Sequence, residues 1–158
     1  PYAGAGAHCL YRLRPERGAD PDELADLPPR ERDLLLAHGG SLVWAATDPP
    51  ADDAADHEAR AHGAIMALDP GGKPRQVVET GPVTQLLGRG DLLYFTETYL
   101  RGDSAVSILR QTTLDGTTQR LGRLGGFITG AVILGDTLYW SGDRGIERLR
   151  LDEEKVEP

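Results

Sequence analysis

Short apolar segments separated by glycine-containing turns recur along the chain, and three of them align without gaps. They read RERDLLLAHGGSLVW, GPVTQLLGRGDLLYF and GFITGAVILGDTLYW, at residues 30–44, 81–95 and 126–140. Gly39, Gly90 and Gly135 share one column, and a glycine there supplies the positive φ that a tight hairpin turn requires. Each segment therefore predicts an apolar strand, a short turn and a second strand that ends in an aromatic residue.

A further strand and a turn follow each hairpin, and in two repeats a polar fourth strand comes next. The dipeptides that lead into this turn are Leu68-Asp69, Leu114-Asp115 and Leu151-Asp152. Four antiparallel strands in about 45 residues are typical of a propeller blade. The sequence therefore predicts an all-β fold, a β-propeller with about three and a half four-stranded blades in this chain and minimal helix.

The repeat divides the chain into four parts of one propeller domain. They are a partial blade at 1–29, with strands expected at 8–13 and 22–27, a blade at 30–80 with a long loop at 46–62, a blade at 81–125, and a blade at 126–158 with an incomplete outer strand. Propellers close with roughly 4–8 blades. We therefore expect a part of a larger ring, completed by further blades of the same polypeptide or by another chain. An open repeat array or a sandwich of the same hairpins is the alternative.

Two segments carry a resemblance to a known family. LYWSGDRGIERLRLDE at 138–153 and LYFTE at 93–97 resemble the YWTD-type repeat of six-bladed propellers in low-density lipoprotein receptors. The matching residues are Tyr94 and Tyr139 for the Tyr of the motif, Trp44 and Trp140 for its Trp, and Thr96 for its Thr, with Glu97 where Asp is usual. The chain is similar in the same way to bacterial six-bladed propellers of the TolB or NHL sort. The resemblance implies a ring of six blades.

Composition narrows the class of partner. Hydrophobic residues make up 39% of the chain and the formal net charge is −8, which fits a soluble globular protein and argues against binding to nucleic acid or anionic lipid. No apolar run reaches the ~20 residues of a membrane span.

Cys9 is the only cysteine, so an internal disulfide is excluded and a buried structural thiol is expected. The chain begins at Pro1 without an initiator methionine, as expected of a fragment or a processed product. Its Arg-, Ala- and Gly-rich composition suggests a bacterial source, and the compartment stays open, with periplasm or extracellular space favoured over cytoplasm.

Function is expected in the loops between the second and third strands, because these vary while the hairpins at the other end stay short. The loops are expected at 46–62, 98–105 and 141–145. The candidate binding residues on this face are Asp48, Glu97, Arg101, Asp143 and Arg144. Asp33, Thr84 and Thr129 share one column near the start of the first strand, and we expect them at the mouth of the central channel.

The residues predict no catalytic group, metal or cofactor. His57 and His62 lie five residues apart in the acidic loop, whereas a zinc helix spaces them by four, and the loop lacks the glycine and alternating oxygen ligands of a calcium site. The predicted function is a non-catalytic scaffold that binds a protein, peptide or carbohydrate partner through loops on one face. The alternative is a lactonase-like hydrolase or cofactor-dependent enzyme, with ligands at the channel mouth supplied partly by blades outside this chain.

Overall fold

The computed structural model describes residues 8–12, 22–27, 34–47, 62–101 and 104–151, and these form an all-β fold. The strands are β1 (His8–Arg12), β2 (Asp22–Leu27), β3 (Leu35–His38), β4 (Ser41–Thr47), β5 (Gly63–Leu68), β6 (Arg75–Thr80), β7 (Val83–Arg89), β8 (Leu92–Arg101), β9 (Ser104–Thr113), β10 (Thr118–Gly125), β11 (Gly130–Leu134), β12 (Thr137–Gly142) and β13 (Gly145–Arg150). Within these residues there is no helix, and so none that could cross a membrane.

Successive strands pair with their neighbours in antiparallel sheets. Strands β3–β6 form sheet one, β7–β10 form sheet two, β11–β13 form sheet three, and β1 pairs with β2 in a separate hairpin. The predicted strand order is confirmed in both four-stranded sheets, and in sheet three for the part that the structure describes. The prediction of strands at residues 8–13 and 22–27 is also confirmed, since β1 and β2 fall there.

The predicted turn glycines adopt the expected backbone. Gly39, Gly90 and Gly135 have φ of 57°, 56° and 59°, a left-handed conformation that is unfavourable for a residue with a Cβ. The hairpins that they close share one register. Leu36 pairs with Val43 in sheet one, Leu87 with Tyr94 in sheet two, and Val132 with Tyr139 in sheet three. Each pair occupies the same two columns of the sequence alignment.

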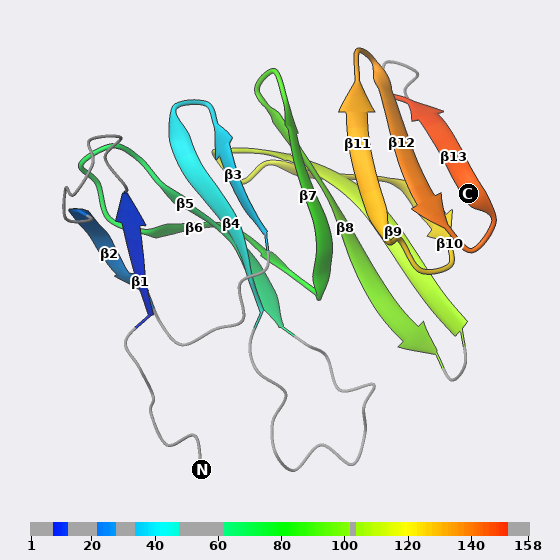
Figure 1. The fold of residues 1–158 in the computed structure, drawn as a ribbon, viewed down its shortest axis with the longest axis horizontal. Helices are drawn as coiled ribbons and strands as arrows, with labels where there is room; N and C mark the ends of the chain where they lie inside the picture. The colour runs from blue at the N-terminus through cyan, green and yellow to red at the C-terminus, as the bar shows by residue number, and fades with distance from the viewer. Residues whose placement is uncertain (1–7, 13–21, 28–33, 48–61, 102–103, 152–158) are drawn as a thin grey trace, which may run out of the picture.

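The three sheets lie side by side, with their short hairpins at one end (Figure 1). The first strand of sheet two, β7, contacts β3 of sheet one and β11 of sheet three. Opposite faces of sheet two serve the two interfaces, because side chains alternate along a strand. Leu86 and Phe95 face sheet one, while Leu87 on the other face packs toward sheet three. Figure 1 shows an open stack, with the β1–β2 hairpin beside sheet one and β13 at the other side.

Two apolar clusters hold the stack together. Between sheets one and two, Val43, Ile65 and Ala67 pack against Leu86, Leu93 and Phe95. Between sheets two and three, Leu109 and Leu124 pack with Ile128, Leu138 and Trp140. Burial of this kind contributes about 25 cal/mol per Å² of apolar surface removed from water. Leu138 and Trp140 thus pack between sheets two and three, whereas Tyr139 alternates to the opposite face with Val132.

Polar contacts fix the stack at its hairpin end. Arg75 Nη1 on β6 donates to the carbonyl oxygen of Leu114 in the β9–β10 turn at 2.8 Å. Arg89 at the end of β7 forms an ion pair with Asp136 in the β11–β12 turn. Each sheet is therefore linked to the next by a guanidinium group that reaches across the interface.

Two of the expected loops are shorter than the sequence indicated. Residues 98–101 and 104–105 belong to strands β8 and β9 rather than to a loop, and the segment at 141–145 is a turn with only Asp143 and Arg144 between strands. Thr98, Tyr99 and Val106 are good strand formers, and the pairing of β8 with β9 continues to Arg101. Of the long loop expected at 46–62, Ala46 and Thr47 belong to β4, and residues 48–61 lie outside the described residues.

Candidate functional site

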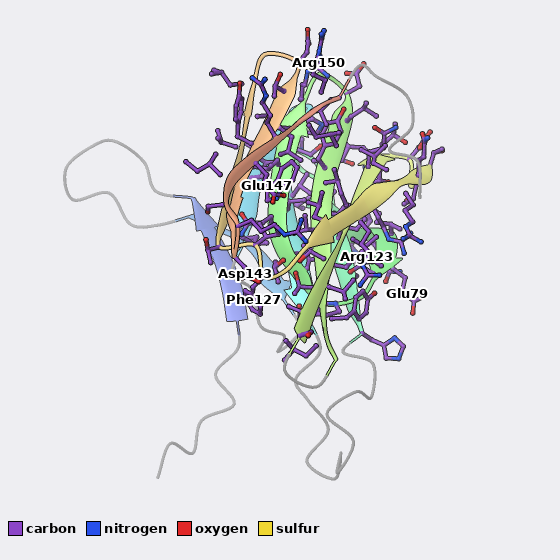
Figure 2. All side chains as sticks on the ribbon, turned by 90° about the vertical axis from the view of Figure 1, so that its right-hand side faces the viewer. Glu79, Arg123, Phe127, Asp143, Glu147 and Arg150 are labelled. Atoms are coloured by element: carbon purple, nitrogen blue, oxygen red, sulfur yellow. The ribbon has the colours of Figure 1, made fainter. Side chains whose placement is uncertain are left out.

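The turn between β12 and β13 folds over the linker that joins sheets two and three. Gly145, with φ 97°, lets β13 begin after only two residues, Asp143 and Arg144, have followed the end of β12. The Asp143 carboxylate accepts a hydrogen bond from the backbone N–H of Phe127 at 3.4 Å. Gly126 makes this approach possible, since a Cβ there would lie 2.9 Å from Cγ of Asp143. Figure 2 shows Phe127 and Asp143 together, away from the end of β13 that carries Arg150.

A pair of hydroxyl groups lies beside this turn. Thr129 and Ser141 are joined through their side-chain oxygens at 2.8 Å, and the Thr129 N–H donates to the Ser141 carbonyl at 3.0 Å. Phe127, two residues before Thr129, is half-exposed. We define the loop-end surface as Phe127, Thr129, Ser141, Asp143 and Arg144. It offers an aromatic ring, two hydroxyls, one carboxylate and one guanidinium group, which can stack on a partner and form directional and charge-assisted hydrogen bonds.

A chain of hydroxyl groups inside sheet two reaches toward this surface. Thr84 on β7 is 2.8 Å from Thr98 on β8, and Thr98 is 2.8 Å from Ser107 on β9. Ser107 Oγ donates to the carbonyl oxygen of Gly126 at 2.9 Å. Thr84 also pairs with Thr96 at 3.0 Å. The linker that carries Phe127 is therefore anchored to three strands of the preceding sheet.

Glu97 lies inside sheet two, with only 3% of its surface exposed. Its carboxylate accepts hydrogen bonds from Arg110 Nε at 2.8 Å, from the Tyr99 hydroxyl at 3.2 Å and from the Gly81 N–H at 3.0 Å. Burial, and then the negative charge of Glu97, raise the pKa of the Tyr99 hydroxyl. The three donors satisfy a charge that would be costly to bury alone. Glu97 thus ties the sheet-one-to-two linker to β8 and β9.

The predicted site residues are divided between these two regions. Thr129, Asp143 and Arg144 belong to the loop-end surface, whereas Thr84 and Glu97 lie within the polar network of sheet two. Thr84 and Thr129 do share a role, because each bonds a hydroxyl on the second strand of its own sheet. Asp33, Asp48 and the side chain of Arg101 lie outside the described residues, as does the side chain of Cys9.

Sequence reasoning missed Phe127 and Ser141. The signal for Phe127 was present in GGFITG, where an aromatic residue follows two glycines in a linker and has little neighbouring side chain to pack against. The signal for Ser141 was its column, since it aligns with Thr96 of sheet two.

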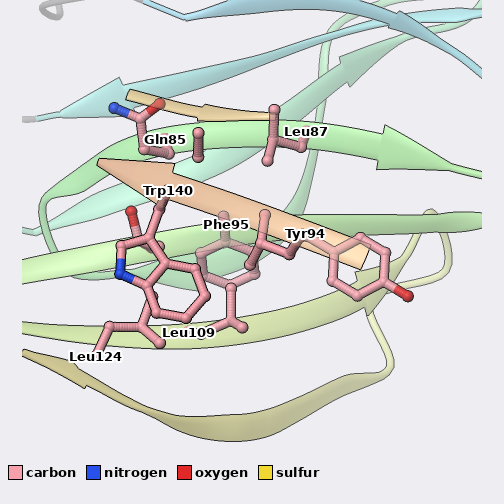
Figure 3. A pocket seen from close by; sticks show the side chains of 10 residues that line it. Gln85, Leu87, Tyr94, Phe95, Leu109, Leu124 and Trp140 are labelled. Carbon is pink, nitrogen blue, oxygen red and sulfur yellow. The ribbon is translucent and has the colours of Figure 1, made fainter. Parts of the chain in front are cut away.

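A small cavity lies between sheets two and three (Figure 3). Its volume of about 10 Å³ is room for about one water molecule, far below the roughly 300–1,000 Å³ of a small-molecule site. The lining residues are Gln85, Leu87, Tyr94, Phe95, Thr96, Leu109, Leu124, Ala131, Leu138 and Trp140. The cavity is a packing gap in the interface. Among the residues that the structure describes, no three His, Cys, Asp or Glu side chains gather in a way that could hold a metal ion.

Comparison of this chain with models of protein families, with curated proteins and with solved structures finds no match in any of the three.

Proposed function

We propose that this chain is part of a β-propeller that acts as a binding scaffold and holds a protein, peptide or carbohydrate partner at the loop-end surface. The propeller assignment is supported by hairpins of equal register whose sheets stack through their first strands. Such sheets are the blades of a propeller when they are arranged around an axis. Further blades would complete the ring.

The observation that carries the binding proposal is the position of Phe127. Its ring is half-exposed, although apolar rings are normally buried, and its backbone is held by Asp143. An aromatic side chain fixed on a rigid rim supplies contact area at low entropic cost. Arg144 in the same turn provides donors in a planar fork that suits a carboxylate or a carbonyl.

The hydrogen bonds that hold the linker before Phe127 also favour binding, because a binding surface should be rigid. Ser107 and the hydroxyl chain behind it fix the Gly126 carbonyl before a partner arrives. A surface held in this way loses little conformational freedom on binding, which favours affinity.

The experiment is a binding screen with a glycan array and a displayed peptide library. We expect selected binders to lose about tenfold or more affinity for Phe127→Ala and Arg144→Ala. Leu100→Ala, at an exposed apolar residue outside the surface, is the matched control and should bind normally. Binders that tolerate both surface substitutions, or a screen without specific binders, would contradict the proposal.

A further inference from the structure

The outer face of sheet three exposes apolar and cationic side chains together. Val132 and Leu134 on β11 are 57% and 72% exposed, and Ile146 on β13 is 80% exposed. Arg148, two residues after Ile146, is also exposed and lies on the same face, because side chains alternate along a strand. We define these four residues as the sheet-three face. Ile133, which alternates with Val132, packs toward sheet two instead, and Figure 1 places sheet three at the end of the stack.

In the two earlier repeats, the position of Val132 is covered by the sheet that follows. Val132 shares a column with Leu36 of sheet one and Leu87 of sheet two. Leu36 packs into the cluster between sheets one and two, and Leu87 into the cluster between sheets two and three. No further sheet follows sheet three among the described residues, and there the same position is on the surface.

The third strands of the sheets show the same relationship at Ile146. Ile146 on β13 corresponds in register to Ile65 on β5 and Leu109 on β9, because each lies opposite the residue that follows the aromatic end of its sequence unit. Ile65 and Leu109 are 0% and 1% exposed and pack in the two clusters between sheets. The sheet-three face therefore has the apolar pattern of an interface with a further sheet, and exposed patches of this kind mark sites of interaction.

Arg148 distinguishes this face from the two earlier ones. Its register equivalents are Ala67 in sheet one and Gln111 in sheet two. No hydrogen bond or ion pair joins the Arg148 guanidinium to another described residue. A sheet that covers Arg148 removes a cation from water, and this is costly unless that sheet supplies a carboxylate. The chain already contains such a pair, because Arg89 reaches from sheet two to the Asp136 carboxylate of sheet three.

We infer that the sheet-three face binds a β-sheet from outside this chain, and that this partner is apolar with a carboxylate opposite Arg148. Aliphatic side chains of the partner cover Val132 and Ile146, and its carboxylate forms a charge-assisted hydrogen bond with the guanidinium group. Interfaces are enriched in arginine, and their buried centres are apolar. The assignment of this partner rests on the proposed function, in which a further blade supplies the sheet, and is independent of what the loop-end surface binds.

A selection against the whole chain tests this inference without directing binders to any region. The probe is a displayed library of fibronectin type III domains in which one sheet face is randomised. We expect most binders to lose about tenfold or more affinity for Val132→Glu and for Arg148→Ala, and to depend on an Asp or Glu of their own. Arg120→Ala is the matched control, because Arg120 is an exposed arginine on β10 of sheet two, and it should leave binding unchanged. Circular dichroism checks that each variant keeps its fold.

Charge reversal separates the carboxylate from nonspecific apolar binding. Arg148→Glu should weaken binding by more than Arg148→Ala, and exchange of the binder's carboxylate for Lys should restore part of the affinity, because the pair is rebuilt with opposite signs. Binders that tolerate Arg148→Ala, binders that tolerate Val132→Glu, or a selection without binders would each overturn the inference. Sedimentation velocity gives a fourth contrary result if the chain associates with itself and Val132→Glu abolishes that association, because the occupant is then a second copy. These measurements do not involve Phe127, so their failure is distinct from failure of binding at the loop-end surface.

Discussion

Arg110 on β9 donates a hydrogen bond from Nε to the buried carboxylate of Glu97 on β8 at 2.8 Å. The two side chains differ in exposure, since 32% of Arg110 and 3% of Glu97 remain accessible. Removal of the arginine would leave a charge without water, whereas removal of the carboxylate would leave a guanidinium that solvent can reach. The consequences of the two substitutions should therefore be unequal.

The prediction is that Arg110→Met destabilises the chain more than Glu97→Gln. We expect a loss of about 3 kcal/mol for Arg110→Met, because it leaves the Glu97 carboxylate buried without its cation. Glu97→Gln keeps an acceptor for Gly81 and should cost about 1 kcal/mol. Urea denaturation measures both. Gln111→Met, which removes an exposed hydrogen bond on the same strand, should change stability by only about 0.5 kcal/mol. Equal losses of stability in Arg110→Met and Glu97→Gln would contradict the assignment of Glu97 as a buried carboxylate that depends on Arg110.

The hydroxyl chain makes a second prediction, which concerns the linker. Ser107→Ala should cost about 1 kcal/mol, because it removes the donor to the Gly126 carbonyl and a partner of Thr98. Amide hydrogen exchange at residues 126–129 should also become faster, since the linker loses its anchor. Ser104→Ala is the control on the same strand, where the side chain is exposed. If amide exchange at residues 126–129 is unchanged in Ser107→Ala, the chain of hydroxyl groups does not hold the linker in place.

The interface between sheets one and two makes a third prediction. Gly116 has φ 91° and a Cβ there would lie 2.6 Å from the Val77 carbonyl oxygen. Gly90 has φ 56° with open space around the Cβ position. Both alanine variants should lose about 1 kcal/mol to backbone strain. Gly116→Ala should lose about 1–3 kcal/mol more, because its methyl group collides with the neighbouring sheet. Equal midpoints in urea would argue against the close approach of these sheets.

The fourth prediction concerns acid. Asp69 accepts hydrogen bonds from Ser41 Oγ at 2.5 Å and from Arg75 Nε at 3.3 Å, and these partners, Ser41 first, lower the pKa of its carboxyl group. A carboxyl with a lowered pKa in the folded state stabilises the fold above its unfolded pKa of about 3.9. That contribution is lost as pH falls through the lower folded value. A carbon-13 NMR titration should show the pKa of Asp69 rising in Ser41→Ala, and an unchanged titration curve would contradict the assigned cause.

The strand pattern and the turns could be read from sequence because both depend on local chemistry. Gly39, Gly90 and Gly135 mark turns through their own backbone freedom, and the apolar columns mark the faces that pack. The position of Glu97 could not be read in this way. It follows an aromatic strand and resembles a loop carboxylate, and only the folded sheet brings Arg110 to it from 13 residues later. Only three of the five residues of the loop-end surface were predicted for the same reason, since Asp143 meets Phe127 only across the turn.

The central claim is that successive sheets stack through their first strands, and one contact tests it most directly. His38 on β3 lies against Gly88 on β7, where a Cβ would be 2.5 Å from the imidazole Nδ1. A nuclear Overhauser effect spectrum of the labelled chain should therefore contain a cross-peak between the Gly88 α-protons and the His38 ring. If both resonances are assigned and this cross-peak is absent, the stack, and with it the proposed propeller, is contradicted.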